Sequence, residues 1–138
     1  LLDAVIALRT RTDRSPPTLA EAALTDLIRE GHFAAHLRRA RRQAEAARDA
    51  LVAGLSTAKN LTVDIPDQGL HLVAGLPISL SDTDAVEIAR KAGLGVRALS
   101  TMAVSETPRQ GLVIGFSGFS PDILREAAMR FAASIADY

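Results

Sequence analysis

The longest periodic stretch of hydrophobic positions in the chain runs from Leu19 to Leu55, with a break at Gly31. After that break, apolar or small residues recur in alternating steps of four and three, which places them on one stripe of an α-helix. The stripe consists of Phe33, Leu37, Ala40, Ala44, Ala47, Leu51 and Leu55. At about 1.5 Å per residue this helix would be roughly 33 Å long, and we expect the later part of the chain to cover one face of it.

Two shorter helices are predicted before the long one. The chain opens on Leu1 with helical spacing of apolar residues and with neither an initiator Met nor an N-cap. The polar Pro-Pro segment from Thr12 to Pro17 ends this helix, because a residue before proline avoids the α conformation. We therefore expect residues 1–17 to be a helix and linker cut from a preceding large domain, and residues 18–138 to form one small domain.

The second predicted helix begins at Thr18, which forms a capping box with Glu21. Its predicted buried side carries Leu19, Ala23, Leu27 and Ile28.

Beyond Gly54 the pattern changes from helical to alternating. Residues 61–65 and 69–76 are typical of strands, and the Pro-Asp-Gln-Gly turn between them predicts a hairpin. Ser81 and Asp84 form a capping box for a helix that Gly93 ends, with Val86, Ile88, Ala89 and Ala92 on its buried side.

The last third of the chain predicts two more strands and a final helix. A short strand at 96–99 and a polar loop at 101–110 precede the apolar run 112–116, which predicts a strand buried on both faces. Ser120 and Pro121 then begin a helix whose buried side carries Leu124, Ala127, Ala128, Phe131 and Ile135. The pattern indicates an α+β fold, a three- or four-stranded sheet covered by helices, with a long N-terminal helix.

Composition limits the classes of function. The chain has 138 residues, 48% of them apolar, and its 16 basic and 16 acidic residues cancel, so net charge favours neither nucleic acid nor an anionic membrane. It contains no Cys, which excludes disulfides, thiolate catalysis and Cys-type zinc sites. No signal peptide or membrane span is predicted, and we expect a soluble protein of the cytoplasm.

Four blocks of the sequence carry a resemblance to a known family. They are GHFAAHLRRARR with a downstream RDAL, GLHLVAGLP, GLGVRALS, and GLVIGFSGFSPDILREA. In order and spacing they resemble the C-terminal part of the aminotransferase-like domain of MocR-type regulators of the GntR family, and the resemblance extends from Leu1 to Ala136. It implies the small C-terminal domain of a fold-type I pyridoxal-phosphate protein. The large domain and an N-terminal winged helix that binds DNA would precede it, and the intact protein would be a homodimer that responds to a small amino-acid-like effector.

The chain itself lacks the residues of a pyridoxal-phosphate site, which needs a Schiff-base Lys, an acid beside the pyridine nitrogen and phosphate donors. Its two lysines, Lys59 and Lys91, are best explained as solvated surface residues, and the family's Lys belongs to the large domain. We predict no catalytic or cofactor-binding residue here and no bound pyridoxal phosphate.

The resemblance does imply an effector-facing wall. Many class I aminotransferases carry at the head of the last strand an Arg that clamps the substrate carboxylate, a role suited to the planar guanidinium. Here that position is Leu112. Arg109, three residues earlier, and Arg97, on the neighbouring strand, are the candidate effector-binding residues, with Ser100 and Thr101 weaker candidates. The alternative for each is a solvated side chain.

Other patterns favour structural roles. His32 and His36 have the i, i+4 spacing of zinc ligands, with His71 as a conceivable third, but Phe33 stands where a zincin has its Glu, and we predict no metal site. The glycines at 111, 115 and 118 lack the residues of a phosphate loop. The arginines at positions 38, 39, 41 and 42 are interpreted as a solvated or interdomain helix face.

Three hypotheses follow. The chain belongs to a MocR-type regulator, to a free-standing class I aminotransferase, or to an independent α+β module that binds a partner. A winged helix, a bare large domain or a start codon upstream of Leu1 would distinguish them, so whether the parent is an enzyme is left open. We also expect the isolated chain to dimerise through the long helix.

Overall fold

The computed structural model describes residues 1–12, 18–104 and 107–138. The chain divides into two compact units, Leu1–Ala40 and Arg41–Tyr138. The predicted Pro-Pro linker lies almost wholly outside the described residues, and a domain boundary between residues 17 and 18 stays a prediction. In the described part of the chain, no helix is long and apolar enough to cross a membrane.

The first unit consists of helices only. It contains α1 (Leu2–Thr12), α2 (Thr18–Arg29) and the first residues of α3 (His32–Leu55). Gly31, at φ +79°, separates α2 from α3 as predicted. The described residues of this unit include none that is buried, so the predicted buried side of α2 is wrong here: Leu19 is 85% exposed and Ile28 is 55% exposed. The spacing identified residues that share a side of the helix, but nothing within the unit covers that side.

The long helix α3 has the predicted stripe, but only its second half is covered. Ala47, Leu51 and Leu55 are buried, whereas Phe33 and Leu37 are each 38% exposed. The second unit therefore supplies a core for the last turns of α3, from Ala47 onward.

The second unit is built on a four-stranded sheet. Its strands are β1 (Thr62–Asp64), β2 (His71–Gly75), β3 (Val96–Ala98) and β4 (Leu112–Gly115). The spatial order is β1-β2-β4-β3, and every neighbouring pair is antiparallel. The predicted hairpin of the first two strands is confirmed by the pairing of β1 with β2. Helix α4 (Asp82–Lys91) connects β2 to β3, which are not neighbours in the sheet. The last strand, β4, lies between them and pairs with both.

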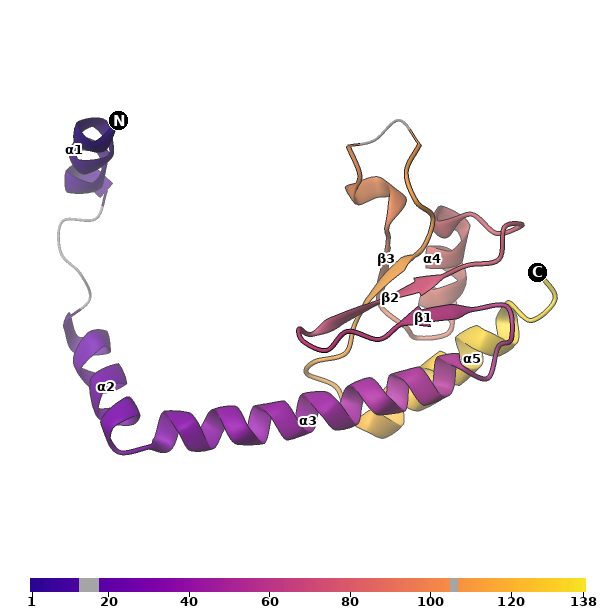
Figure 1. Ribbon diagram of the computed structural model, residues 1–138, viewed down its shortest axis with the longest axis horizontal. Helices are drawn as coiled ribbons and strands as arrows, with labels where there is room; N and C mark the ends of the chain where they lie inside the picture. Colours follow the sequence, from indigo (N-terminus) through magenta and orange to yellow (C-terminus); the bar gives the residue numbers. More distant parts are fainter. Residues whose placement is uncertain (13–17, 105–106) are drawn as a thin grey trace. The chain divides into compact units, whose positions relative to one another are not determined.

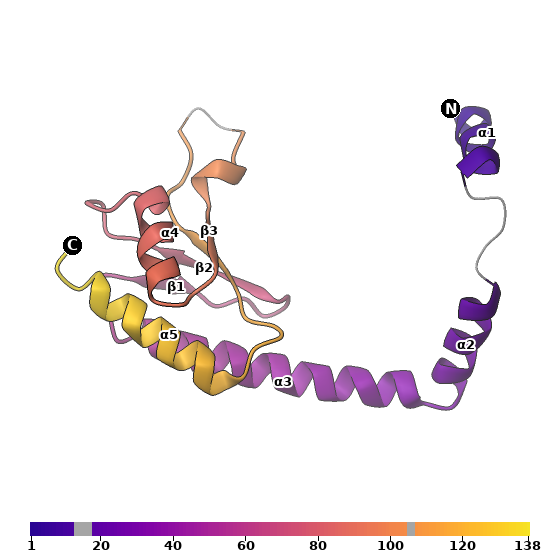
Figure 2. The same cartoon turned by 180° about the vertical axis from the view of Figure 1, so that it is seen from behind.

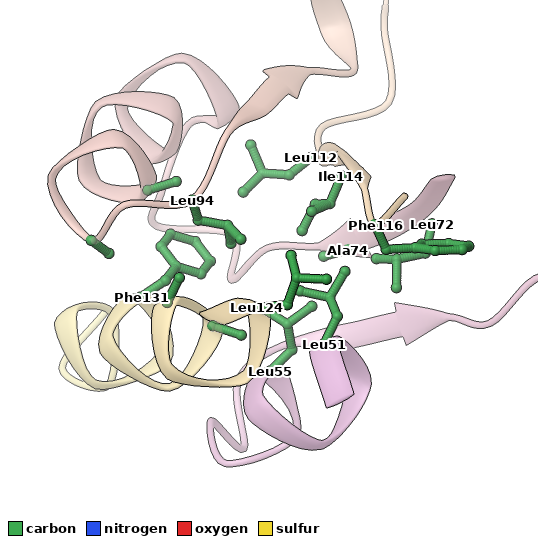
Figure 3. Packing of buried hydrophobic residues seen from close by; sticks show 14 of the residues in the cluster. Leu51, Leu55, Leu72, Ala74, Leu94, Leu112, Ile114, Phe116, Leu124 and Phe131 are labelled. Carbon is green, nitrogen blue, oxygen red and sulfur yellow. The ribbon is translucent and has the colours of Figure 1, made fainter. Parts of the chain in front are cut away.

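Helices lie on one face of this sheet. Figure 1 shows the strands in front, and Figure 2, from behind, shows α4 and α5 (Pro121–Ser134) in front of them. Side chains from α3, α5 and the sheet meet in one hydrophobic cluster (Figure 3). Its largest fully buried members include Leu51, Leu55, Leu72, Leu112, Ile114, Phe116 and Phe131. The predicted α+β fold is thus confirmed, with four strands.

The strand β4 corrects one prediction. Leu112 and Ile114 are fully buried, but Val113 between them and Gly115 after them are only half-buried. The alternation arises because β4 belongs to an antiparallel sheet with helices on one face, whereas a strand buried on both faces needs two covering layers.

The predicted ends of α4 and the predicted start of α5 are confirmed. The Ser81 hydroxyl accepts the Asp84 N–H at the start of α4, and Ser120 caps α5 ahead of Pro121. Gly93, at φ +84°, follows α4, and the Leu94 N–H donates to the Ala89 carbonyl at 2.9 Å. This bond from the second residue past the C-cap residue, Ala92, is typical of a Schellman motif.

Helices α3 and α5 are in close contact at Gly54. A Cβ built at this position would lie 2.6 Å from Ala128 Cβ and 2.7 Å from the Arg125 carbonyl oxygen, both on α5. Both distances are shorter than van der Waals contact allows, so this crossing depends on the missing side chain.

Candidate functional site

The sheet face opposite the helices carries the first of the two predicted arginines. The strand registers align Asp64 of β1, Val73 of β2, Val113 of β4 and Arg97 of β3 in one row across this face. The two valines are half-buried, while Asp64 and Arg97 are exposed. Asp64 and Arg97 therefore lie on opposite edge strands. Neighbouring strands are about 4.8 Å apart, so the three steps of this row separate the backbones of the two residues by roughly 14 Å.

Arg109 borders the same face from the β1 edge. Its Nη2 donates to Asp64 Oδ2 at 2.9 Å, and the two side chains are 65% and 61% exposed. Such an exposed ion pair contributes little to folding, less than about 1 kcal/mol, and competing ions can break it. The structure therefore places both predicted arginines around one face without bringing them into contact.

A buried carboxylate fixes the two segments that carry these arginines. Asp82, at the start of α4, is 1% exposed. Its Oδ1 accepts the Ser100 hydroxyl at 2.7 Å, and its Oδ2 accepts the N–H groups of Ser100 at 2.8 Å and Gly111 at 3.3 Å. Its own backbone N–H donates to Gln110 Oε1 at 2.9 Å. One side chain thus joins the end of β3 to the start of β4.

These contacts set the charge state of Asp82. Burial acts to raise its pKa, but hydrogen bonds from the Ser100 amide and hydroxyl and from the Gly111 and Thr83 amides outweigh burial, so the pKa lies below the ordinary value of 3.8. The side chain is therefore ionised near neutral pH, and its acceptor sites match the donors around it.

The weaker candidates have structural partners. The Ser100 hydroxyl is committed to Asp82, and the Thr101 hydroxyl donates to the Ala98 carbonyl at 2.8 Å. Each hydroxyl hydrogen is thus engaged, so either group could contact an effector only as an acceptor without giving up that bond.

The described residues do not fit pyridoxal phosphate. Lys59 is exposed in the turn before β1, and Lys91 is exposed at the end of α4 in a shallow groove between α4 and α5. Neither lysine lies in an enclosed pocket that also offers a carboxylate for the pyridine nitrogen and donors for the phosphate, which a pyridoxal-phosphate site would need. That the chain binds no cofactor stays a prediction.

The histidines form no metal-binding cluster among the described residues, where no group of three or more suitable ligands occurs. His32 begins α3 and lies 3.2 Å from Glu30. His71 lies against Gly115 on the sheet, in a different unit from His32 and His36.

Sequence reasoning missed the role of Asp82. An acidic residue in the first turn of a helix is common, because it complements the helix dipole in water. The donors that bury Asp82 come from residues 18 and 29 positions further along, so the local pattern gave no sign of them.

The chain is similar to curated regulators. It is 35% identical over 128 residues to the probable rhizopine catabolism regulatory protein MocR of Rhizobium meliloti, covering 91% of this chain and 26% of that protein. It is 26% identical over 108 residues to the HTH-type transcriptional regulator YhdI of Bacillus subtilis, covering 77% of this chain and 23% of that protein. The predicted resemblance to MocR-type regulators is confirmed. The chain spans about a quarter of the length of these two regulators. No family model matches it.

Solved structures with the same fold as this MocR-like chain include several aminotransferases and a decarboxylase from Sulfurospirillum multivorans. An archaeal alanine:glyoxylate aminotransferase superposes with a TM-score of 0.81 at 18% identity, over 97% of this chain and 34% of that one. The α-aminoadipate aminotransferase LysN of Thermus thermophilus, solved with N-(5'-phosphopyridoxyl)-L-leucine, gives 0.78 at 18% identity, over 97% and 35%. At such low identity these likenesses establish the fold, which is that of the C-terminal region of an aminotransferase.

Proposed function

We propose that this chain is the C-terminal part of a pyridoxal-phosphate-dependent, MocR-type transcriptional regulator and forms the effector-side wall of its cofactor cleft. The observation that carries the proposal is the 35% identity to a MocR protein over 91% of the chain, combined with an aminotransferase fold. On this proposal residues 1–17 lead out of the large domain, and residues 18–138 form the small domain. The chain has no complete active site of its own.

The rest of the protein would supply what this part lacks. Because Lys59 and Lys91 are exposed and separate, pyridoxal phosphate would be held by residues of the large domain. DNA would be bound by an N-terminal winged helix, and the regulator would act in the cytoplasm as a homodimer. Ligand chemistry at the cofactor would change the grip of the dimer on DNA.

Within this chain, Arg109 and Arg97 are the proposed effector-binding residues. A guanidinium binds a carboxylate through two parallel hydrogen bonds, which suits an amino-acid-like effector. Arg109 already holds a carboxylate, that of Asp64, and an effector would take the place of Asp64. The ion pair is exposed on both sides, so this exchange costs little.

The test uses the whole gene product that contains this chain. We expect its absorbance spectrum to show an internal aldimine with pyridoxal phosphate, and its mobility shift on promoter DNA to change with one of a panel of amino acids. Arg109→Ala and Arg97→Ala should raise the amino acid concentration needed at least tenfold, whereas Arg125→Ala, an exposed arginine on the helix side, should not. A protein that forms no aldimine band, or that responds equally in all three variants, would refute the proposal.

A free-standing class I aminotransferase is the second candidate, favoured by the aminotransferases among the solved structures with this fold. A gene product that carries no winged helix and transfers amino groups would establish it. Arg109→Ala and Arg97→Ala would then raise KM for the amino acid instead of altering DNA binding.

A further inference from the structure

The connection between β3 and β4 carries both proposed effector-binding residues near its ends. Arg97 lies three positions before Ser100, and Arg109 lies two positions before Gly111. The Leu99 N–H donates to the Gly111 carbonyl at 2.8 Å, so the two ends already pair along the backbone. The backbone amides of Ser100 and Gly111 both donate to one group, the Asp82 carboxylate.

We propose that Asp82 is a positioning residue that fixes the two arginine-bearing segments relative to each other. A single oxygen, Oδ2, accepts from Ser100 at the end of β3 and from Gly111 at the start of β4, so movement of either segment breaks a bond to the same atom. The Asp82 backbone N–H, in the first turn of α4, also donates to the side chain of Gln110, which is the neighbour of Arg109. The relevance of this device to effector binding rests on the proposed function of the arginines.

The alternative is that Asp82 only adds stability. The two roles differ in what Asp82→Asn should do. Asparagine keeps one carbonyl oxygen for the two amides, and its NH2 can donate to the Ser100 oxygen, which accepts as well as donates. Asp82→Asn should therefore keep the geometry, Asp82→Ala should lose it, and the double variant Asp82→Asn/Ser100→Ala should lose it too, because the buried NH2 then has no acceptor.

The experiment is amide hydrogen exchange and NMR of this chain without ligand. We expect exchange at Ser100 and Gly111 to become at least tenfold faster in Asp82→Ala and in the double variant, with shifted Nε–H signals of Arg97 and Arg109. Asp82→Asn should stay within about threefold of wild type. Ile135→Val, which trims the core beneath α5, is the control for a general loss of stability and should leave these signals in place.

Unchanged exchange and Nε–H signals in Asp82→Ala, or an equal response in Ile135→Val, would overturn the proposal. If Asp82→Ala does not fold, the double variant against Asp82→Asn gives the same comparison. Failure of the proposed function has a different signature. In that case the ligand-free signals would move as expected, while substitutions of Arg97 and Arg109 in the whole gene product would leave its amino acid response unchanged.

Discussion

Replacement of Gly54 by alanine tests how tightly the helix layer is packed. In an exposed helix the change would stabilise by about 1 kcal/mol, because alanine is the better helix former. Here the new methyl group meets Ala128 Cβ at 2.6 Å and the Arg125 carbonyl oxygen at 2.7 Å, and neither is the mobile end of a flexible side chain. Overpacking of this kind costs up to about 3 kcal/mol. We therefore expect a net loss of about 2 kcal/mol, or a fall of about 10 °C in Tm.

Urea and thermal unfolding of the chain, followed by circular dichroism, measure this change. Ala53→Gly, at the exposed neighbouring position on α3, is the matched control and should lose only the propensity difference of about 1 kcal/mol. Adding Ala128→Gly to Gly54→Ala removes the first contact but not the one with the carbonyl oxygen, and it costs helix propensity in α5, so the double variant should lose less than the sum of the two single variants. A Gly54→Ala protein as stable as wild type would show that α3 and α5 are not in close contact.

Three further predictions concern polar groups. Because the pKa of Asp82 is lowered on folding, its carboxylate contributes fully to stability at pH values well above 3.8, and this contribution is lost as the pH falls through the pKa of the folded state. Urea midpoints should therefore fall between pH 6 and pH 2, and the fall should be smaller in Asp82→Asn. Arg130→Ala removes the Nε–H that donates to the Ala92 carbonyl at 3.0 Å past the end of α4, and should lower the free energy of unfolding by about 1 kcal/mol, a value that an unchanged urea midpoint would contradict. A double-mutant cycle between Asp64 and Arg109 should give less than about 1 kcal/mol in dilute buffer and less still in 1 M salt; a larger, salt-independent coupling would mean that the pair is not readily exchanged.

Features of the fold that depend on neighbouring residues were predictable from the sequence. The caps at Ser81 and Ser120, the stop at Gly93 and the buried side of α5 follow from contacts within one or two helical turns, and the structure has all of them. Whether the apolar side of α2 is buried could not be predicted from neighbouring residues in this way. Its apolar spacing shows which side would be buried against a partner, but a periodic pattern does not say where that partner is.

The candidate site was predictable in its residues but not in its arrangement. Arg97 and Arg109 were identified through a family resemblance, while their placement around one face depends on the registers of β3 with β4 and of β1 with β2. The pairing that joins these two registers is that of β2 with β4, in which Val73 lies opposite Val113, 40 positions further along the chain. Asp82 was missed for a similar reason, because its burial depends on the chain that returns at Ser100 and Gly111.

The strand order of the second unit has a consequence for folding during synthesis. The β1–β2 hairpin is local and can form as soon as it leaves the ribosome, but β2 and β3 each pair with β4, which is made last of the four strands. Until Leu112 and the residues after it emerge, both strands present open edges whose backbone groups are available to other chains. We expect a nascent or truncated chain that ends before β4 to aggregate, and the final helix, which follows directly, to close the core only after the sheet is complete.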